Sequence, residues 1–296
     1  MKIIVTGSLG HIGKPLTEEL VAKGHDVVVV SSKLEKQQEI EALGATAAIG
    51  TLADAEFLTA TFTGADAVYT MVPPNYAATD MMAYCREMGE NFAEAIEKSG
   101  VKRVVHLSSI GAHMEKGSGL ILAHKQVEDI FEKLPSDVAI TFMRPSGFYY
   151  NLLGFIPGIK AAGVIVANYG AGDMLIWVAP ADIAAAIADE LEIPTTGRVV
   201  RYVASDELTG NETARILGEA IGKPDLQWIL VSDEEREQQL ESFGLPPAMA
   251  HGLVEMFSAQ HTGALAEDFY RYWPEVMGKV KMADYAKEFA AIYNQK

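Results

Sequence analysis

The stretch MKIIVTGSLGHIGKPLTEEL, residues 1–20, decides the fold. Lys2 to Thr6 is expected to form a buried strand, because its apolar residues are consecutive rather than alternating. A turn containing Gly7, Gly10 and Gly13 follows, and beyond it apolar residues recur at helical spacing. A helix that begins after such a turn presents unpaired backbone N–H groups and the positive end of its dipole. The stretch therefore predicts an anion cradle. Its position after the first strand favours the pyrophosphate of a dinucleotide over a turn that only packs tightly.

Composition excludes several classes of protein. The 296 residues carry a net charge of -16 and are 49% hydrophobic, which is typical of a soluble globular chain that binds neither nucleic acid nor anionic membranes. No apolar run is long enough to span a membrane and no signal peptide is recognisable, so the expected compartment is the cytoplasm. The only cysteine, Cys85, is interpreted as a small buried residue rather than a nucleophile. The seven histidines form no metal-binding pattern, so no metal site is predicted.

Strands and helices are expected to alternate through the first half of the chain. Further strands are predicted at residues 26–30, 45–50, 67–72, 103–107 and 139–143, and helices at 36–43, 53–61, 79–99 and 122–134. This alternation implies right-handed crossovers and a doubly wound parallel α/β sheet of the Rossmann type.

The pattern changes after Arg144. Residues 154–172 are rich in glycine and lack a clear period, and residues 233–296 are expected to be mostly helical. We therefore predict a dinucleotide-binding domain at 1–152, with 178–192 packing back on it. Residues 153–296 are predicted to form a smaller, mostly helical, interleaved lobe for a substrate or a partner.

The end of the second strand indicates which dinucleotide is preferred. NAD-binding sheets usually carry an acidic residue there, whereas this chain has Ser31, Ser32 and Lys33. Two hydroxyls and an ammonium group can neutralise a 2′-phosphate, so NADP(H) is preferred over NAD(H). The alternative is a polar loop without a ligand, and Glu35 lies slightly too far along the chain to replace the missing acid.

Several segments resemble the NmrA-like branch of the atypical short-chain dehydrogenases/reductases. They are TGSLGHIG (6–13), SSIGA (108–112), HKQVED (124–129) and TFMRPSGFYYN (141–151). Their order and spacing extend the resemblance over nearly the whole chain. The resemblance implies a Rossmann domain that binds NAD(P) and, in active members of the superfamily, a Tyr-x-x-x-Lys pair after the fifth strand.

That pair is missing from this chain. Aligning Glu128 with the family's glutamate places Leu120 at the tyrosine and His124 at the lysine. The family contains quinone, azo-dye and triphenylmethane reductases without the pair, and also noncatalytic NADP-sensing regulators. A conjugated acceptor can take hydride directly because its charge is delocalised. The sequence thus predicts NADPH-dependent reduction of a quinone or similar conjugated aromatic acceptor, with a noncatalytic sensor that binds a partner protein as the alternative. A homodimer is left open.

The candidate site residues follow from these positions. Cofactor contacts are expected from Gly7, Ser8, Leu9, Gly10, His11, Ile12, Gly13, Ser31, Ser32, Lys33, Met71, Val72, Pro73, Ser108 and His124. The acceptor is expected to contact Ser109, Phe148, Tyr149 and Tyr150. His124 and Tyr149 are the catalytic candidates, and Tyr76 is a second choice of proton donor by its place in a loop. The alternatives are a surface role for His124, turn bonding for the serines and core packing for the aromatic residues.

Overall fold

The computed structural model describes residues 1–75, 78, 80–274 and 276–295. The chain forms two compact units. The first comprises Met1–Ser109, Ala123–Arg144 and Ile183–Arg201, and the second comprises Ile110–Leu122, Pro145–Asp182 and Tyr202–Lys296. These units divide residues 110–122, 145–152, 178–182 and 193–201 differently from the predicted domains. One reason is close packing within the second unit, where a Cβ atom on Gly119 would overlap the backbone of Gly252.

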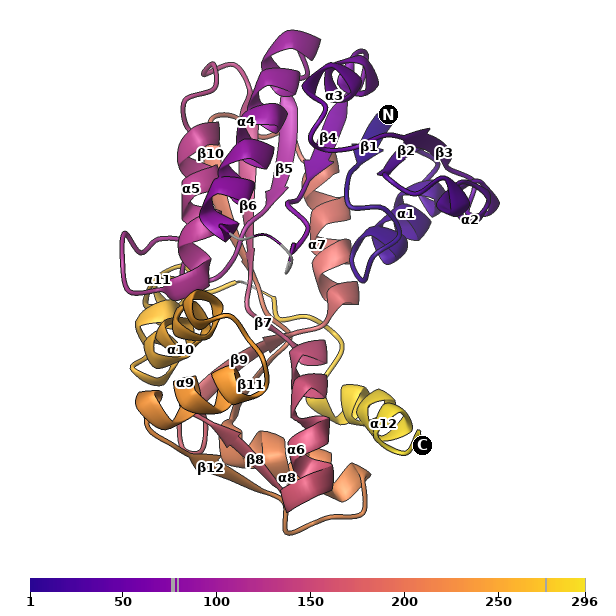
Figure 1. Cartoon of the computed structure of the whole chain (residues 1–296). Helices are drawn as coiled ribbons and strands as arrows, with labels where there is room; N and C mark the ends of the chain where they lie inside the picture. The colour runs from indigo at the N-terminus through magenta and orange to yellow at the C-terminus, as the bar shows by residue number, and fades with distance from the viewer. Residues whose placement is uncertain (76–77, 79, 275, 296) are drawn as a thin grey trace. The chain divides into compact units, whose positions relative to one another are not determined.

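The described part of the first unit is organised around a seven-stranded sheet (Figure 1). Its order is β10-β6-β5-β4-β1-β2-β3, and the strands from β3 to β6 pair in parallel. The bounds are β1 Lys2–Val5, β2 Asp26–Ser31, β3 Thr46–Ile49, β4 Ala67–Thr70, β5 Arg103–Leu107, β6 Ala139–Pro145 and β10 Arg198–Val203. The strand order reverses direction between β1 and β4, the position where such sheets bind ligands at their carboxyl ends. The prediction of a doubly wound sheet is confirmed.

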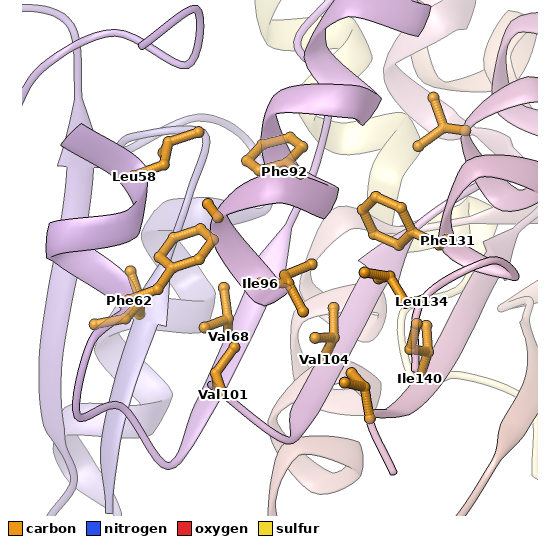
Figure 2. Packing of buried hydrophobic residues seen from close by; sticks show 14 of the residues in the cluster. Leu58, Phe62, Val68, Phe92, Ile96, Val101, Val104, Phe131, Leu134 and Ile140 are labelled. Carbon is orange, nitrogen blue, oxygen red and sulfur yellow. The ribbon is translucent and has the colours of Figure 1, made fainter. Parts of the chain in front are cut away.

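Three helices cover one face of this sheet. They are α3 (Ala55–Phe62), α4 (Met81–Ser99) and α5 (Leu122–Phe131). The strand register aligns Ile4, Val68, Val104 and Ile140 in one row across the sheet, and all four belong to a single buried cluster. Figure 2 shows helix side chains of this cluster, including Leu58, Phe62, Phe92, Ile96 and Phe131, packed among the strand residues.

The other helices of the first unit are α1 (Gly13–Ala22), α2 (Gln37–Ala42) and most of α7 (Pro180–Glu192), together with the short 3-10 turn η1 (Leu34–Lys36). Lys23, which follows α1, forms ion pairs with Asp189 and Glu192 of α7. No helix in the described residues is both long enough and apolar enough to cross a membrane.

The second unit contains two small sheets besides its helices. One has the order β11-β9-β7 and the other pairs β12 with β8. These strands are β7 Gly147–Phe148, β8 Val164–Ala167, β9 Met174–Val178, β11 Asp206–Thr209 and β12 Gln227–Leu230. The helices are η2 Gly119–Ile121, η3 Tyr149–Phe155, α6 Ile156–Ala162, α8 Gly210–Ala220, α9 Asp233–Ser242, α10 Pro247–His261, η4 Ala264–Ala266, α11 Glu267–Arg271 and α12 Met282–Tyr293. The stretch 154–172, which showed no period, therefore contains a helix and a strand.

Candidate functional site

The three glycines after β1 have different surroundings. Gly7 has a φ of +90°, and a Cβ atom there would lie 2.7 Å from the sulfur of Met71. A Cβ atom on Gly13 would overlap the carbonyl oxygen of Ser8. The nearest neighbour of a Cβ atom on Gly10 would be the carbonyl oxygen of Gly7, at the ordinary distance of 3.5 Å. Internal packing therefore explains Gly7 and Gly13 but not the exposed Gly10, where a ligand could approach the backbone.

The N-terminus of α1 is suited to an anion. Its N-cap residue, Ile12, supplies no side-chain cap, and the first turn contains no acidic residue. By contrast, Asp54 and Asp80 cap α3 and α4 through their side chains. The first N–H groups of α1 therefore lack the side-chain acceptor that α3 and α4 have. Gly10 and His11 are exposed at this end, while Leu9 is half-buried.

The end of β2 is tied to the glycine turn through Ser31. This side chain is buried, and its hydroxyl oxygen accepts hydrogen bonds from the Ser8 hydroxyl at 3.0 Å and from the Lys33 backbone N–H at 3.2 Å. Ser32 and Lys33 are exposed. Ser31 thus fixes the local backbone, and the groups presented outward are the Ser32 hydroxyl and the Lys33 ammonium.

The segment after β4 forms a fixed wall beside the turn. The Met71 backbone N–H donates to the Thr6 hydroxyl at 3.1 Å, and the Met71 side chain lies against Gly7. Val72 and Pro73 are half-buried, and the Tyr84 hydroxyl donates to the Pro73 carbonyl at 3.1 Å. Tyr76, the second choice of proton donor, lies outside the described residues.

A buried ion pair lies at the carboxyl end of β5. The Glu128 carboxylate accepts from the Ser108 hydroxyl at 2.5 Å and from Nε and Nη2 of Arg144 at 2.9 and 2.6 Å. All three side chains are buried, whereas Ser109 is half-buried. Glu128 on α5 is thereby bonded to Ser108 after β5 and to Arg144 in β6, and the Ser108 hydroxyl donates its proton to the Glu128 carboxylate. The sequence analysis missed Arg144 in this role, although a charged residue at the end of an apolar strand was the available signal.

Two histidines near this end are held in the neutral form. His124 lies half-buried on α5, and desolvation lowers its pKa to about 4. His106 is buried in β5, where its Nδ1 lies 3.0 Å from the Thr70 hydroxyl and its ring packs on Phe131. Desolvation, followed by the field of His124, lowers the pKa of His106 to about 3. His106 was also missed, because a histidine inside the run VVHL reads as part of a strand.

The predicted acceptor contacts Phe148, Tyr149 and Tyr150 belong to the second unit. Phe148 and Tyr150 are half-buried, with their ring centroids 5.1 Å apart. Tyr149 is fully buried and stacks on Tyr285, and its hydroxyl donates to the Val280 carbonyl at 3.1 Å. Burial, reinforced by three nearby carboxylates, raises the pKa of Tyr149. This environment favours the packing role for Tyr149, and its catalytic role stays a prediction.

A doubly wound sheet with a glycine turn and an uncapped helix at its switch point defines a dinucleotide-binding fold. The sequence profile of the NmrA-like family matches residues 1–287, so the chain belongs to the NmrA-like family. The resemblance seen in the sequence segments is therefore confirmed.

Three relatives illustrate the similarity. The NAD(P)H azoreductase of Xenophilus azovorans is 26% identical over 98% of this chain and 99% of its own length. The NADPH-dependent quinone oxidoreductase QOR2 of Escherichia coli, solved with NADPH, has a TM-score of 0.81 at 23% identity and covers 97% of this chain and 99% of its own. The Citrobacter sp. triphenylmethane reductase, complexed with NADP(H), has a TM-score of 0.80 at 22% identity and covers 97% and 99%.

Proposed function

We propose that this protein transfers hydride from NADPH to a quinone or a similar conjugated aromatic acceptor. The chain is an NAD(P)H-dependent oxidoreductase by its kinship with reductases such as the azoreductase that it matches along nearly its whole length. The choice of NADPH and the class of acceptor are the finer parts of the proposal, and they are supported by the residues described above.

The observation that carries the proposal is the exposed backbone at Gly10, where a Cβ atom would meet no clash, in front of a helix that has no side-chain N-cap. The glycine allows a pyrophosphate to approach the backbone, and the first N–H groups of α1 can donate to its oxygens. Ser32 and Lys33 are exposed at the end of β2, where a carboxylate would repel a 2′-phosphate. Met71, Val72 and Pro73 line the same edge of the sheet. These features fit a dinucleotide, which when bound supplies hydride from its nicotinamide ring.

The acceptor class follows from the two sequence positions that align with the family's tyrosine and lysine. The position aligned with the family's tyrosine holds Leu120, whose side chain packs close to Gly252 and carries no proton to donate. His124 is neutral at physiological pH, so its imidazole can hydrogen-bond a ribose without introducing charge but holds no imidazolium proton to donate to the acceptor. An isolated ketone needs an acid at its oxygen. A quinone, an azo dye or a cationic triphenylmethane dye distributes the incoming charge and needs chiefly orientation.

The test is NADPH oxidation, followed by nicotinamide absorbance, with a panel of quinones, azo dyes and triphenylmethane dyes, and with NADH as the control cofactor. We expect turnover with at least one acceptor class. His124→Asn should lower kcat about 10-fold or more while changing the Kd for NADPH less than about threefold. His251→Asn is the matched control, because His251 is exposed on α10. Reduction of simple ketones at rates equal to those of quinones would contradict the acceptor class.

The sensor alternative is favoured by one observation. Tyr270, Tyr272, Trp273 and Val276 are 46%, 61%, 44% and 82% exposed, which is unusual for large apolar side chains near one another in sequence. Tight NADPH binding without turnover on any acceptor of the panel would support the sensor and overturn the reductase proposal.

A further inference from the structure

Two neighbouring aromatic side chains in the second unit are exposed and nearly parallel. The ring centroids of Tyr270, on α11, and Trp273, two residues beyond α11, lie 5.8 Å apart with an interplanar angle of 19°. Both side chains are exposed, whereas Phe269 is buried and packs edge-on against both rings, with centroid distances of 5.5 and 5.0 Å. The rings of Tyr270 and Trp273, called here the aromatic platform, are thus held in place before any ligand binds.

Polar contacts from two strands hold α11 and the platform. Tyr202 in β10 donates its hydroxyl to Oδ2 of Asp268 at 2.6 Å, and its ring packs edge-on against Phe269. The Tyr270 hydroxyl donates to Oε1 of Glu207 in β11. Burial, followed by this hydrogen bond, raises the pKa of Tyr270, so the phenol keeps its proton. Donation to a carboxylate makes the phenol ring more electron-rich, which strengthens the attraction of its face for a cation.

The segments that carry the platform and Glu207 are acidic. Residues 206–207 and 266–281 have a net charge of -2, from five acidic side chains and three basic ones: Asp206, Glu207, Glu267, Asp268 and Glu275 against Arg271, Lys279 and Lys281. Among the basic side chains, Arg271 lies 3.9 Å from Asp268, and Lys281 donates to a backbone carbonyl. In a chain of net charge -16, these segments attract a cation and repel an anion.

The same charge argues against a second copy of the chain as the occupant. A symmetric contact through the platform would bring two acidic segments together. Two adjacent rings also offer much less area than the roughly 800 Å² that each partner contributes to a specific protein interface. A planar ligand with two fused rings can instead cover the platform. Rings that are already fixed lose little freedom when such a ligand binds.

We propose that Tyr270 and Trp273 form a binding platform for a planar aromatic cation, with Glu207 supplying negative charge beside it. The ligand stacks on the rings, and its positive charge is attracted by their faces and by the acidic side chains. The platform lies wholly within the second unit and its occupancy does not require NADPH, so the site goes beyond the proposed hydride transfer. It also gives the exposed aromatic residues a ligand other than the partner protein of the sensor alternative.

The experiment titrates the full-length protein, without NADPH, with N-methylquinolinium and with quinoline, which is uncharged at pH 8, by calorimetry at low ionic strength. We expect the cation to bind at least about fivefold more tightly than quinoline. Trp273→Leu should weaken cation binding about 3- to 10-fold, and Glu207→Gln about 2- to 5-fold with less than about a twofold change for quinoline. Cation binding should also quench tryptophan fluorescence through Trp273, because Trp177 and Trp228 are buried.

Phe243→Leu and Glu241→Gln are the matched controls, because they alter an exposed ring and an exposed carboxylate at the end of α9 that lie outside the platform. Urea unfolding checks that each variant is folded. Equal affinity for N-methylquinolinium and quinoline, or wild-type cation affinity in Trp273→Leu, would overturn the platform. Self-association that Trp273→Leu abolishes would also overturn it, because a second copy would then occupy the rings. Failure of the reductase proposal would appear as absent NADPH oxidation and would leave these titrations unchanged.

Discussion

Two regions at the carboxyl edge of the seven-stranded sheet differ in how their polar groups are hydrogen-bonded: the ends of β1 and β2, and the end of β5. At the ends of β1 and β2, α1 lacks a side-chain cap, and Gly10 and Lys33 are exposed. At the end of β5, Ser108, Glu128 and Arg144 are buried and bonded to one another. The first end leaves its hydrogen-bonding capacity for an outside group, whereas the second uses it internally.

The exposed groups at the ends of β1 and β2 are suited to binding a ligand, whereas the bonded groups at the end of β5 are suited to fixing the geometry of a reaction. Backbone donors and exposed ammonium groups bind an anion, and they tolerate small shifts because the attraction is not strongly directional. A site for hydride transfer instead requires fixed geometry. The buried pair between Glu128 and Arg144 fixes α5 against β5 and β6, and α5 carries His124. Removing one partner of such a pair leaves an uncompensated buried charge, so the arrangement is held firmly.

The largest expected effect comes from placing a side chain at Gly10, at the end of the edge near β1 and β2. Gly10→Val should reduce the affinity for both NADPH and NADH at least about 100-fold, because the side chain would occupy the space that a pyrophosphate needs. The fold should persist, since a Cβ atom at Gly10 meets only an ordinary contact. The measurements are nucleotide titration and urea unfolding.

Gly13→Ala is the contrasting variant. Its Cβ atom would overlap the Ser8 carbonyl, so the turn must move, and we expect a loss of about 2 to 4 kcal/mol in the free energy of unfolding. Wild-type nucleotide affinity in Gly10→Val would refute the assignment of the exposed Gly10 backbone to dinucleotide contact.

The exposed end of the edge could be predicted from the sequence because its signals are local. The glycine spacing, the first strand and the residues after β2 lie within 33 positions of the N-terminus and require no knowledge of long-range packing. The buried end could not be predicted in the same way. Glu128 and Arg144 meet only because β5 and β6 pair and α5 covers them, and His106 reads as an ordinary strand position until its partner Thr70 is placed on β4.

The second unit shows the same limit. The strands β7 and β11 have two and four residues, too few to display a period, and the interpretation of Tyr149 from its loop position could not reveal its burial. Glu39 and Lys14 are 25 positions apart and become neighbours only through the packing of α1 and α2.

An intermediate effect is expected from pH, and it would sharpen the contrast between the exposed and buried ends. The pKa values of His106 and His124 lie near 3 and 4 in the folded protein, below the ordinary value of about 6.5. The unfolded chain therefore binds more protons, and stability rises with pH between the folded and unfolded values. We expect the free energy of unfolding to fall by about 2 kcal/mol per histidine from pH 7 to pH 5.

Urea unfolding at several pH values measures this slope. His106→Asn and His124→Asn should each remove roughly half of the histidine contribution, whatever their stability at pH 7. His251→Asn, which replaces an exposed histidine, should retain the wild-type slope. A slope unchanged in both buried-site variants would mean that these imidazoles are not held neutral by burial.

The smallest effect is expected at Tyr149 in the second unit. Its hydroxyl is hydrogen-bonded within the protein, as the side chains at the end of β5 are. Tyr149→Phe should cost about 1 kcal/mol of stability, because the Val280 carbonyl loses its donor while the stacking on Tyr285 remains. Turnover should stay within about twofold of wild type, since the hydroxyl proton is directed at the backbone. Tyr285→Phe is the matched control: the Tyr285 hydroxyl is buried without a partner among the described residues, so its removal should leave stability unchanged or raise it. A tenfold fall in kcat with unchanged stability in Tyr149→Phe would instead establish Tyr149 as the proton donor.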